Sequence, residues 1–157
     1  MARWLLEVDD LLVQALPAGA ELWRGIETPL HRAYLDAPDA PGQGWQRLLA
    51  LGSIAGASAG VPARYHYVVE TDVAPEHEAD LNAWYAEEHL PGLAAVPGTV
   101  HAARFRREGS PRYLACYRLV APEVLGSAPW LAVRHTPWSA RVRPTFLNTR
   151  RLMFVAP

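Results

Sequence analysis

Residues 75–93, PEHEADLNAWYAEEHLPGL, decide the expected fold, because they form the one long helical pattern in the chain. Pro75 stands where the first helical turn accepts a proline, and the acidic residues that follow it complement the positive end of the helix dipole. The apolar residues Leu81, Trp84 and Tyr85 recur at spacings of three and four, which gives one buried stripe. The Pro-Gly pair near the end of the segment is expected to stop the helix.

The stretches on either side of this helix predict strands. Residues 64–72, RYHYVVETD, precede the helix and are rich in aromatic and β-branched residues. The resulting order, βαββαβ, is that of a ferredoxin-like α+β unit. The elements expected after the helix are strands at 99–106, 112–119 and 149–155, and helical pieces at 124–135 and from Thr136-Pro137 onward.

The sequence also divides into two unequal parts. Residues 52–60, GSIAGASAG, are small and predict a linker between residues 1–51 and residues 61–157. The first part opens with Ala-Arg-Trp at 2–4 as the second opens with Ala-Arg-Tyr at 63–65, and it lacks a long helix. We therefore expect a complete ferredoxin-like unit at 61–157, preceded by a degenerate half-repeat whose sheet faces the other sheet within one chain.

Composition excludes several classes of function. The 157 residues correspond to about one domain, and 15 basic against 16 acidic residues argue against a surface for nucleic acid. All the lysine and arginine positions are arginine, which excludes mechanisms that need a lysine, such as Schiff-base formation. The single cysteine, Cys116, excludes an internal disulfide and a zinc site built on several thiolates. No dinucleotide motif, apolar span or secretory signal is present. We expect a cytoplasmic protein with no cofactor, no metal and no membrane or nucleic-acid partner.

Several segments resemble a known family. Residues 84–93, WYAEEHLPGL, with Val-Pro-Gly at 96–98, are similar to the helix signature of the dimeric α+β-barrel superfamily, in particular EthD-like proteins. Relatives of these include antibiotic-biosynthesis monooxygenases and muconolactone isomerases. Residues 104–106, RFR, and 111–117, PRYLACY, are similar to the second and third strands of that family. The resemblance covers about residues 63–155, and it implies a small organic ligand held between the sheet and the helices.

His89 is the leading candidate for catalysis. The resemblance implies that it lies near the ligand. Its expected position in the last helical turn, beside Glu87 and Glu88, favours its protonated form, because the helix dipole and both carboxylates stabilise the cation. Such a histidine could donate a proton or orient an enolate, with Glu88 in support. The structural alternative is a histidine that caps the end of the helix.

Other polar residues offer secondary candidates. His66 shares one face of the first strand with Glu70, and both could line a barrel interior; equally, they could be satisfied buried groups. His66 ranks second as a catalytic candidate, and His101 on the next strand ranks third. Arg104 carries a planar guanidinium group whose N–H donors suit a substrate carboxylate or enolate. The expected substrate-binding residues are Trp84, Tyr85, His101, Arg104, Tyr67, Tyr113 and Tyr117.

These residues favour a cofactor-independent enzyme that acts on a small apolar or aromatic metabolite by proton transfer at His89. Isomerisation, cyclisation, carbon–carbon cleavage and oxygenation all fit, because no nucleophile, metal or redox motif selects among them. Two alternatives stay open: a non-catalytic module that binds a small molecule, and a haem protein that uses a histidine ligand. A homodimer is expected, because small barrels of this type usually associate.

Overall fold

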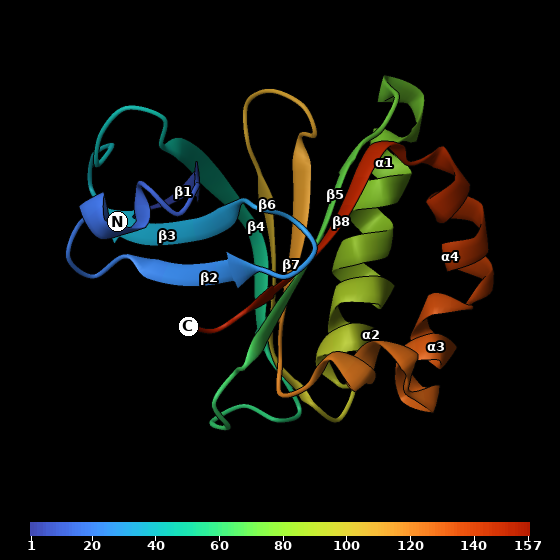
Figure 1. The fold of residues 1–157 in the computed structure, drawn as a ribbon. Coiled ribbons are helices and arrows are strands. Elements are labelled where there is room, and N and C mark those ends of the chain that lie inside the picture. Colours follow the sequence, from blue (N-terminus) through green and yellow to red (C-terminus); the bar gives the residue numbers. More distant parts are fainter.

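Eight antiparallel strands close into a barrel, and four short α-helices cover one face of it (Figure 1). A computed structural model describes all 157 residues. The strand order around the barrel is β1-β3-β2-β8-β5-β7-β6-β4, and β4 pairs with β1 to complete the circle. Closure leaves no open sheet edge. The strands are β1 Ala2–Val8, β2 Glu21–Gly25, β3 His31–Ala37, β4 Gln46–Ala55, β5 Tyr65–Asp72, β6 Thr99–Arg106, β7 Tyr113–Leu119 and β8 Leu147–Val155.

Each half of the chain contributes four neighbouring strands in the same spatial order. In the C-terminal half the order is β8-β5-β7-β6. If the strands of this half are counted from one to four along the chain, the spatial order is 4-1-3-2. The N-terminal half repeats it as β4-β1-β3-β2. The halves meet at a long seam between β4 and β6 and at a short seam between β2 and β8. The predicted ferredoxin-like α+β fold is confirmed; the origin of residues 1–51 as a degenerate repeat stays a prediction.

All the α-helices belong to the C-terminal half and pack against the outer face of its sheet (Figure 1). The long helical segment comprises α1 Pro75–Trp84, a π-helical turn Tyr85–His89 and α2 Leu90–Ala94. Helices α3 Ala128–Arg134 and α4 Pro137–Val142 follow β7. The predicted cap at Thr136 is confirmed, because its hydroxyl accepts the backbone N–H of Ser139 at 3.1 Å. Short 3-10 turns lie at Val13–Ala15, Pro122–Gly126 and Arg143–Thr145.

Strand β5 separates two cores, because its alternate residues point to opposite faces of the sheet. His66, Val68 and Glu70 are buried inside the barrel, so the expected shared face of His66 and Glu70 is confirmed. Tyr65 and Tyr67 pack against the core beneath the helices. The barrel interior and the space under the helices are therefore distinct environments divided by one layer of strands.

Two predicted boundaries are wrong. The helix continues through Pro91 and Gly92 to Ala94. The absence of a side chain at Gly92 allows α3 to pack closely on this turn. A Cβ at this position would lie only 2.8 Å from a methyl group of Val133 in α3. Strand β4 extends to Ala55, four residues into the segment predicted as a linker, because pairing with β6 holds its end in the barrel.

Gly56 provides a test of the long seam. Its N–H donates to the carbonyl oxygen of Val100 at 2.9 Å, and a Cβ there would lie 2.0 Å from the carbonyl oxygen of Thr99. Backbone atoms cannot move aside as a flexible side chain can. Gly56→Ala should therefore lower the free energy of unfolding by roughly 2–3 kcal/mol, measured by urea denaturation. Gly126→Ala, where a Cβ meets nothing within 4 Å, is the matched control; equal losses in the two variants would contradict the prediction.

Candidate functional site

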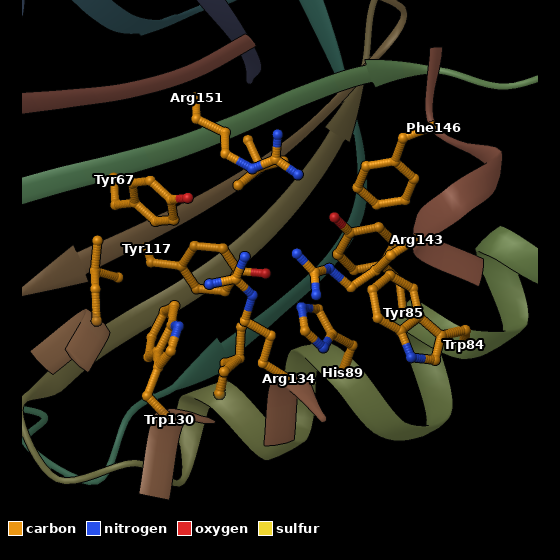
Figure 2. Close-up of a pocket in the computed structure, with 13 residues that line it drawn as sticks. Tyr67, Trp84, Tyr85, His89, Tyr117, Trp130, Arg134, Arg143, Phe146 and Arg151 are labelled. Atoms are coloured by element: carbon orange, nitrogen blue, oxygen red, sulfur yellow. The ribbon is translucent and has the colours of Figure 1, made fainter. Parts of the chain in front are cut away.

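A cleft between the outer face of the sheet and the helices brings His89 together with aromatic rings and three arginines (Figure 2). Its volume is about 100 Å³. Five of the residues expected in the site lie here, namely Trp84, Tyr85, His89, Tyr67 and Tyr117. The remaining lining residues are Val69, Leu93, Leu125, Trp130, Arg134, Arg143, Phe146 and Arg151.

The π-helical turn determines where His89 points. Within it the N–H of Leu90 bonds to the carbonyl of Tyr85, five residues back. Pro91 gives a physical reason for this widening, since a proline lacks the N–H donor and its ring crowds the carbonyl four residues earlier in a regular helix. Widened turns of this kind are frequent at functional sites.

His89 is buried among aromatic rings, with 8% of its surface exposed. Its ring stacks on Trp84 at a centroid distance of 4.0 Å and meets the edge of Tyr85 at 5.4 Å. Its Nδ1 is buried and has no hydrogen-bond partner. Burial, together with the smaller effect of the nearby cations of Arg143 and Arg134, lowers the pKa of His89 to about 3.

The predicted protonation of His89 is therefore wrong. The prediction placed His89 in the last helical turn beside two carboxylates, but the helix continues to Ala94. Glu87 is exposed to solvent. Glu88, expected to support catalysis, does not line the cleft; it accepts hydrogen bonds from Trp84 Nε1 at 3.1 Å and Thr136 Oγ1 at 2.7 Å. It holds the Trp84 ring and the start of α4 in place.

Three unpaired arginines surround the cleft. Arg134 lies at the end of α3, Arg143 begins the 3-10 turn after α4, and Arg151 lies on β8. None of them forms an ion pair, and no carboxylate lines the cleft. In Figure 2 the guanidinium groups of Arg134 and Arg143 lie beside Tyr117 and His89, and that of Arg151 lies above them in the view, toward Phe146. Burial lowers the pKa of Arg143, and so does repulsion from the other two cations.

Tyrosine hydroxyls supply neutral donors. Burial raises the pKa of Tyr85 to about 12 and that of Tyr117 well above its usual value, so both stay protonated at neutral pH. The Tyr117 hydroxyl is buried without a hydrogen-bond partner, and its ring stacks with Tyr67 at 6.2 Å. A buried hydroxyl with no partner is costly, so this group is available for a ligand.

The structure places Arg104 and Tyr113 behind Tyr85, in a neighbouring cavity of about 430 Å³. The Arg104 guanidinium lies 4.3 Å from the Tyr85 ring centroid and 4.7 Å from that of Tyr113, and it donates to Asn82 Oδ1 at 2.7 Å. Burial lowers the pKa of Arg104. Arg104 thus supports the back of the Tyr85 ring and does not line the cleft that contains His89.

His66 and His101 are separated from His89 by the sheet. Both line a cavity of about 680 Å³ inside the barrel. His66 Nε2 lies 2.8 Å from the hydroxyl of Tyr34, and His101 Nε2 lies 2.8 Å from that of Ser53. Burial lowers the pKa of both histidines. Both histidines line the barrel interior, as considered from the sequence, and they lie on the other side of the sheet from His89 because β5 and β6 turn their side chains to that face.

Sequence reasoning missed the residues at the rim of the cleft. The residues expected in the site from the sequence do not include Trp130, Arg134, Arg143, Phe146 or Arg151. The available signal was weak, since these residues lie on three different elements. No group of three or more His, Cys, Asp or Glu side chains is arranged to hold a metal ion. None of the helices has the length and apolar character needed to cross a membrane.

Solved structures share this architecture, although neither a family model nor a curated protein sequence matches the chain. A major regulator of staphylococcal pathogenesis aligns over 100% of both chains with a TM-score of 0.72 and 5% identity. An uncharacterised ferredoxin-fold protein from Listeria monocytogenes, related to antibiotic-biosynthesis monooxygenases, aligns over 100% of this chain and 95% of its own, with a TM-score of 0.70 and 10% identity. A haem-degrading enzyme from Listeria monocytogenes aligns over 100% of both chains with a TM-score of 0.62 and 9% identity.

The chain shares the ferredoxin-like fold of these structures. The resemblance carried by residues 84–93 therefore predicted the fold correctly. In this chain a single polypeptide closes the barrel, because β1–β4 supply the second group of strands. Only the C-terminal sheet of the barrel carries α-helices, so the chain has one cleft of this type.

The buried state of His89 makes stability depend on pH. Its folded pKa of about 3 lies below the usual value of 6.5, so its contribution is complete above pH 6.5 and is lost as pH falls toward 3. Between pH 7.5 and 5.0 this loss amounts to about 2 kcal/mol. Over the same interval, the free energy of unfolding of His89→Gln should fall by about 2 kcal/mol less than that of the wild type, measured by urea denaturation. The exposed His77→Gln is the control and should behave as wild type; a similar change in both variants would contradict the assignment.

Proposed function

We propose that the cleft binds a small planar organic anion and that His89, in its neutral form, takes a proton from it. The observation that supports this is a buried, uncharged histidine facing three arginines that have no acidic partner. On this proposal the protein is a cofactor-independent enzyme of the isomerase, cyclase, lyase or oxygenase type. A guanidinium group donates two parallel hydrogen bonds to a carboxylate, and it can also donate to the single oxygen of a phenolate or enolate.

The walls and the rim of the cleft select different parts of such a ligand. The rings of Tyr67, Tyr117 and Trp130 favour a planar aromatic or conjugated group. An anion at the rim relieves repulsion among the arginines. The enclosed volume of about 100 Å³ is below the ~150 Å³ of a cavity that holds benzene, so a larger ligand requires the rim to open. Arg134 and Arg151 are exposed and unpaired, which leaves their side chains free to move outward.

The proton transfer follows from the same charges. In the free protein His89 is a poor base, because burial and the cations disfavour its protonated form. A bound anion offsets those cations, which raises the pKa of His89 toward the range useful for catalysis. The ring then accepts a proton from a carbon or oxygen of the substrate. The electron pair left behind forms an enolate or phenolate that the arginines and the Tyr117 hydroxyl stabilise.

Two other functions use the same cleft. A binding module would retain the anion without proton transfer. A haem protein would use His89 as an iron ligand and the arginines for the propionates, and one structural neighbour is a haem-degrading enzyme. The cleft volume of about 100 Å³ does not fit a porphyrin, which needs a pocket in the range of about 300–1,000 Å³. A Soret band that shifts and sharpens to saturation on titration with haemin, and that is lost in His89→Gln, would favour the haem function.

Phenylpyruvate, an aromatic carboxylate with an exchangeable C3 proton, tests the proposal. In D₂O the wild type should bind it and accelerate C3 proton exchange, followed by NMR. His89→Gln should bind the probe but slow exchange by about 10²- to 10⁴-fold. Arg143→Gln should weaken binding by about tenfold or more, since a charge-assisted pair contributes about 1.5–3 kcal/mol.

The control is Arg141→Gln, an exposed arginine that pairs with Asp80 outside the cleft and should leave both readings unchanged. Binding without exchange in the wild type would support the binding module. Exchange that survives His89→Gln, or a probe that does not bind, would rule out the proposed proton transfer.

We further infer that residues 1–51 derive from a ferredoxin-like unit that lost its helices, which the equal strand order of the two halves supports. The expected homodimer stays a prediction. Because the closed barrel has no free sheet edge, its copies would associate through helix and loop surfaces. Light scattering should report twice the mass of the chain; a monomer at high concentration would contradict it.

A further inference from the structure

The inside of the barrel is filled at one end and hollow at the other. An eight-stranded barrel is just wide enough either to be filled by side chains or to hold one small ligand. Large side chains such as Leu5, Trp23 and Phe154 pack the filled end. The other end contains the cavity of about 680 Å³, within the range of about 300–1,000 Å³ that is typical of ligand pockets.

Small side chains create the hollow end. Along β4, Leu48 belongs to the filled core, but the lining residues that follow it are alanine, glycine and serine. The same holds on β6, where Ala103 lines the cavity. The small lining residues are Ala50, Gly52, Ala55, Ala59, Ala63 and Ala103.

Charges at the mouth of the cavity neutralise one another. Arg3 pairs with Glu21 at 2.9 Å and with Asp36 at 2.9 Å, and Arg118 pairs with Glu21 at 2.6 Å. Two arginines thus face two carboxylates in a connected network. The contrast with the cleft, where three arginines have no acidic partner, predicts that the two cavities take ligands of different charge. The barrel cavity favours an uncharged molecule, because no charge at its mouth lacks a counterion.

Polar groups inside the cavity are uncharged as well. His66 and Tyr34 are 2% exposed, and their side chains form one hydrogen bond to each other. Burial lowers the pKa of His66 well below its usual value and raises that of Tyr34, so both are neutral. His66 Nδ1 has no partner in the protein. The Trp23 and Phe154 rings flank His66 at centroid distances of 5.1 and 6.0 Å, which gives a flat apolar environment with a hydrogen-bonding group at its centre.

We propose that the barrel interior is a second binding site, for a neutral, largely apolar, planar molecule that carries one hydroxyl or carbonyl group. The ring system lies against the alanines and Phe105, and the polar group reaches the His66–Tyr34 pair. One layer of strands separates this site from the cleft, because His66 and Tyr67 are consecutive residues that point to opposite faces. The two sites can therefore be tested separately.

A matched pair of fluorescent probes distinguishes the sites. N-phenyl-1-naphthylamine is neutral, and 1-anilinonaphthalene-8-sulfonate has the same rings with an added sulfonate. The neutral probe should bind the wild type at one site, and filling that site by Ala103→Leu or Ala63→Leu should weaken its binding by about tenfold or more. The sulfonate should bind this site about tenfold more weakly than the neutral probe. Ala103→Leu should also raise the melting temperature, because the added side chain occupies empty space.

Two controls keep the outcome clear. Ala132→Leu, on the exposed side of α3, should leave binding of the neutral probe unchanged, and so should Arg143→Gln in the cleft. Ala63 lies at the mouth, so Ala63→Leu tests the site even if Ala103→Leu fails to fold. The proposal is overturned if the neutral probe does not bind, if both filled variants bind it as wild type does, or if phenylpyruvate displaces it.

Discussion

The buried ion pair between Arg32 and Glu70 is the interaction on which the rest of the structure depends. Its nitrogen and oxygen atoms lie 2.6 Å apart, and the side chains are 1% and 0% exposed. Arg32 belongs to β3 and Glu70 to β5, so the pair joins the two halves inside the barrel. The pair is the buried centre of a network, because Arg32 also lies 2.8 Å from Glu7, and Glu70 also lies 3.4 Å from Arg107 and 3.5 Å from Arg150. Removing either partner is unfavourable, because it leaves the charges of this network unbalanced inside the barrel. A one-residue slip of β5 is equally unfavourable, since it would turn Glu70 out of the barrel.

The register that this pair fixes also builds both cavities. With Glu70 inside, His66 and Val68 must face the barrel, while Tyr67 and Val69 must face the helices. One strand therefore supplies a wall to the neutral cavity and a wall to the cationic cleft. Their electrostatic difference arises from what surrounds β5. The N-terminal strands bring carboxylates to the cavity mouth, whereas the helical layer and β8 bring arginines and no carboxylate to the cleft.

Local signals predicted the elements well. The residues around Thr136 predicted a capped helix, and 99–106 predicted a strand, because capping and β-branched patterns act over a few residues. The failures involve longer range. Pro91 was expected to end a helix, but α3 packs over Gly92 and stabilises the extra turn. His89 was expected to be a cation, but burial under Trp84 outweighs the dipole and neighbouring carboxylates.

The sequence by itself determined the ferredoxin-like order and the alternation along β5, because both depend on periodicity or on residues close in the chain. Only the tertiary structure decided the site. Arg134, Arg143 and Arg151 come from three elements and meet only after the helices pack on the sheet. Closure of the barrel placed His66 and His89 on opposite sides of one layer. The charge of a histidine depends on burial, and burial is a property of the whole fold.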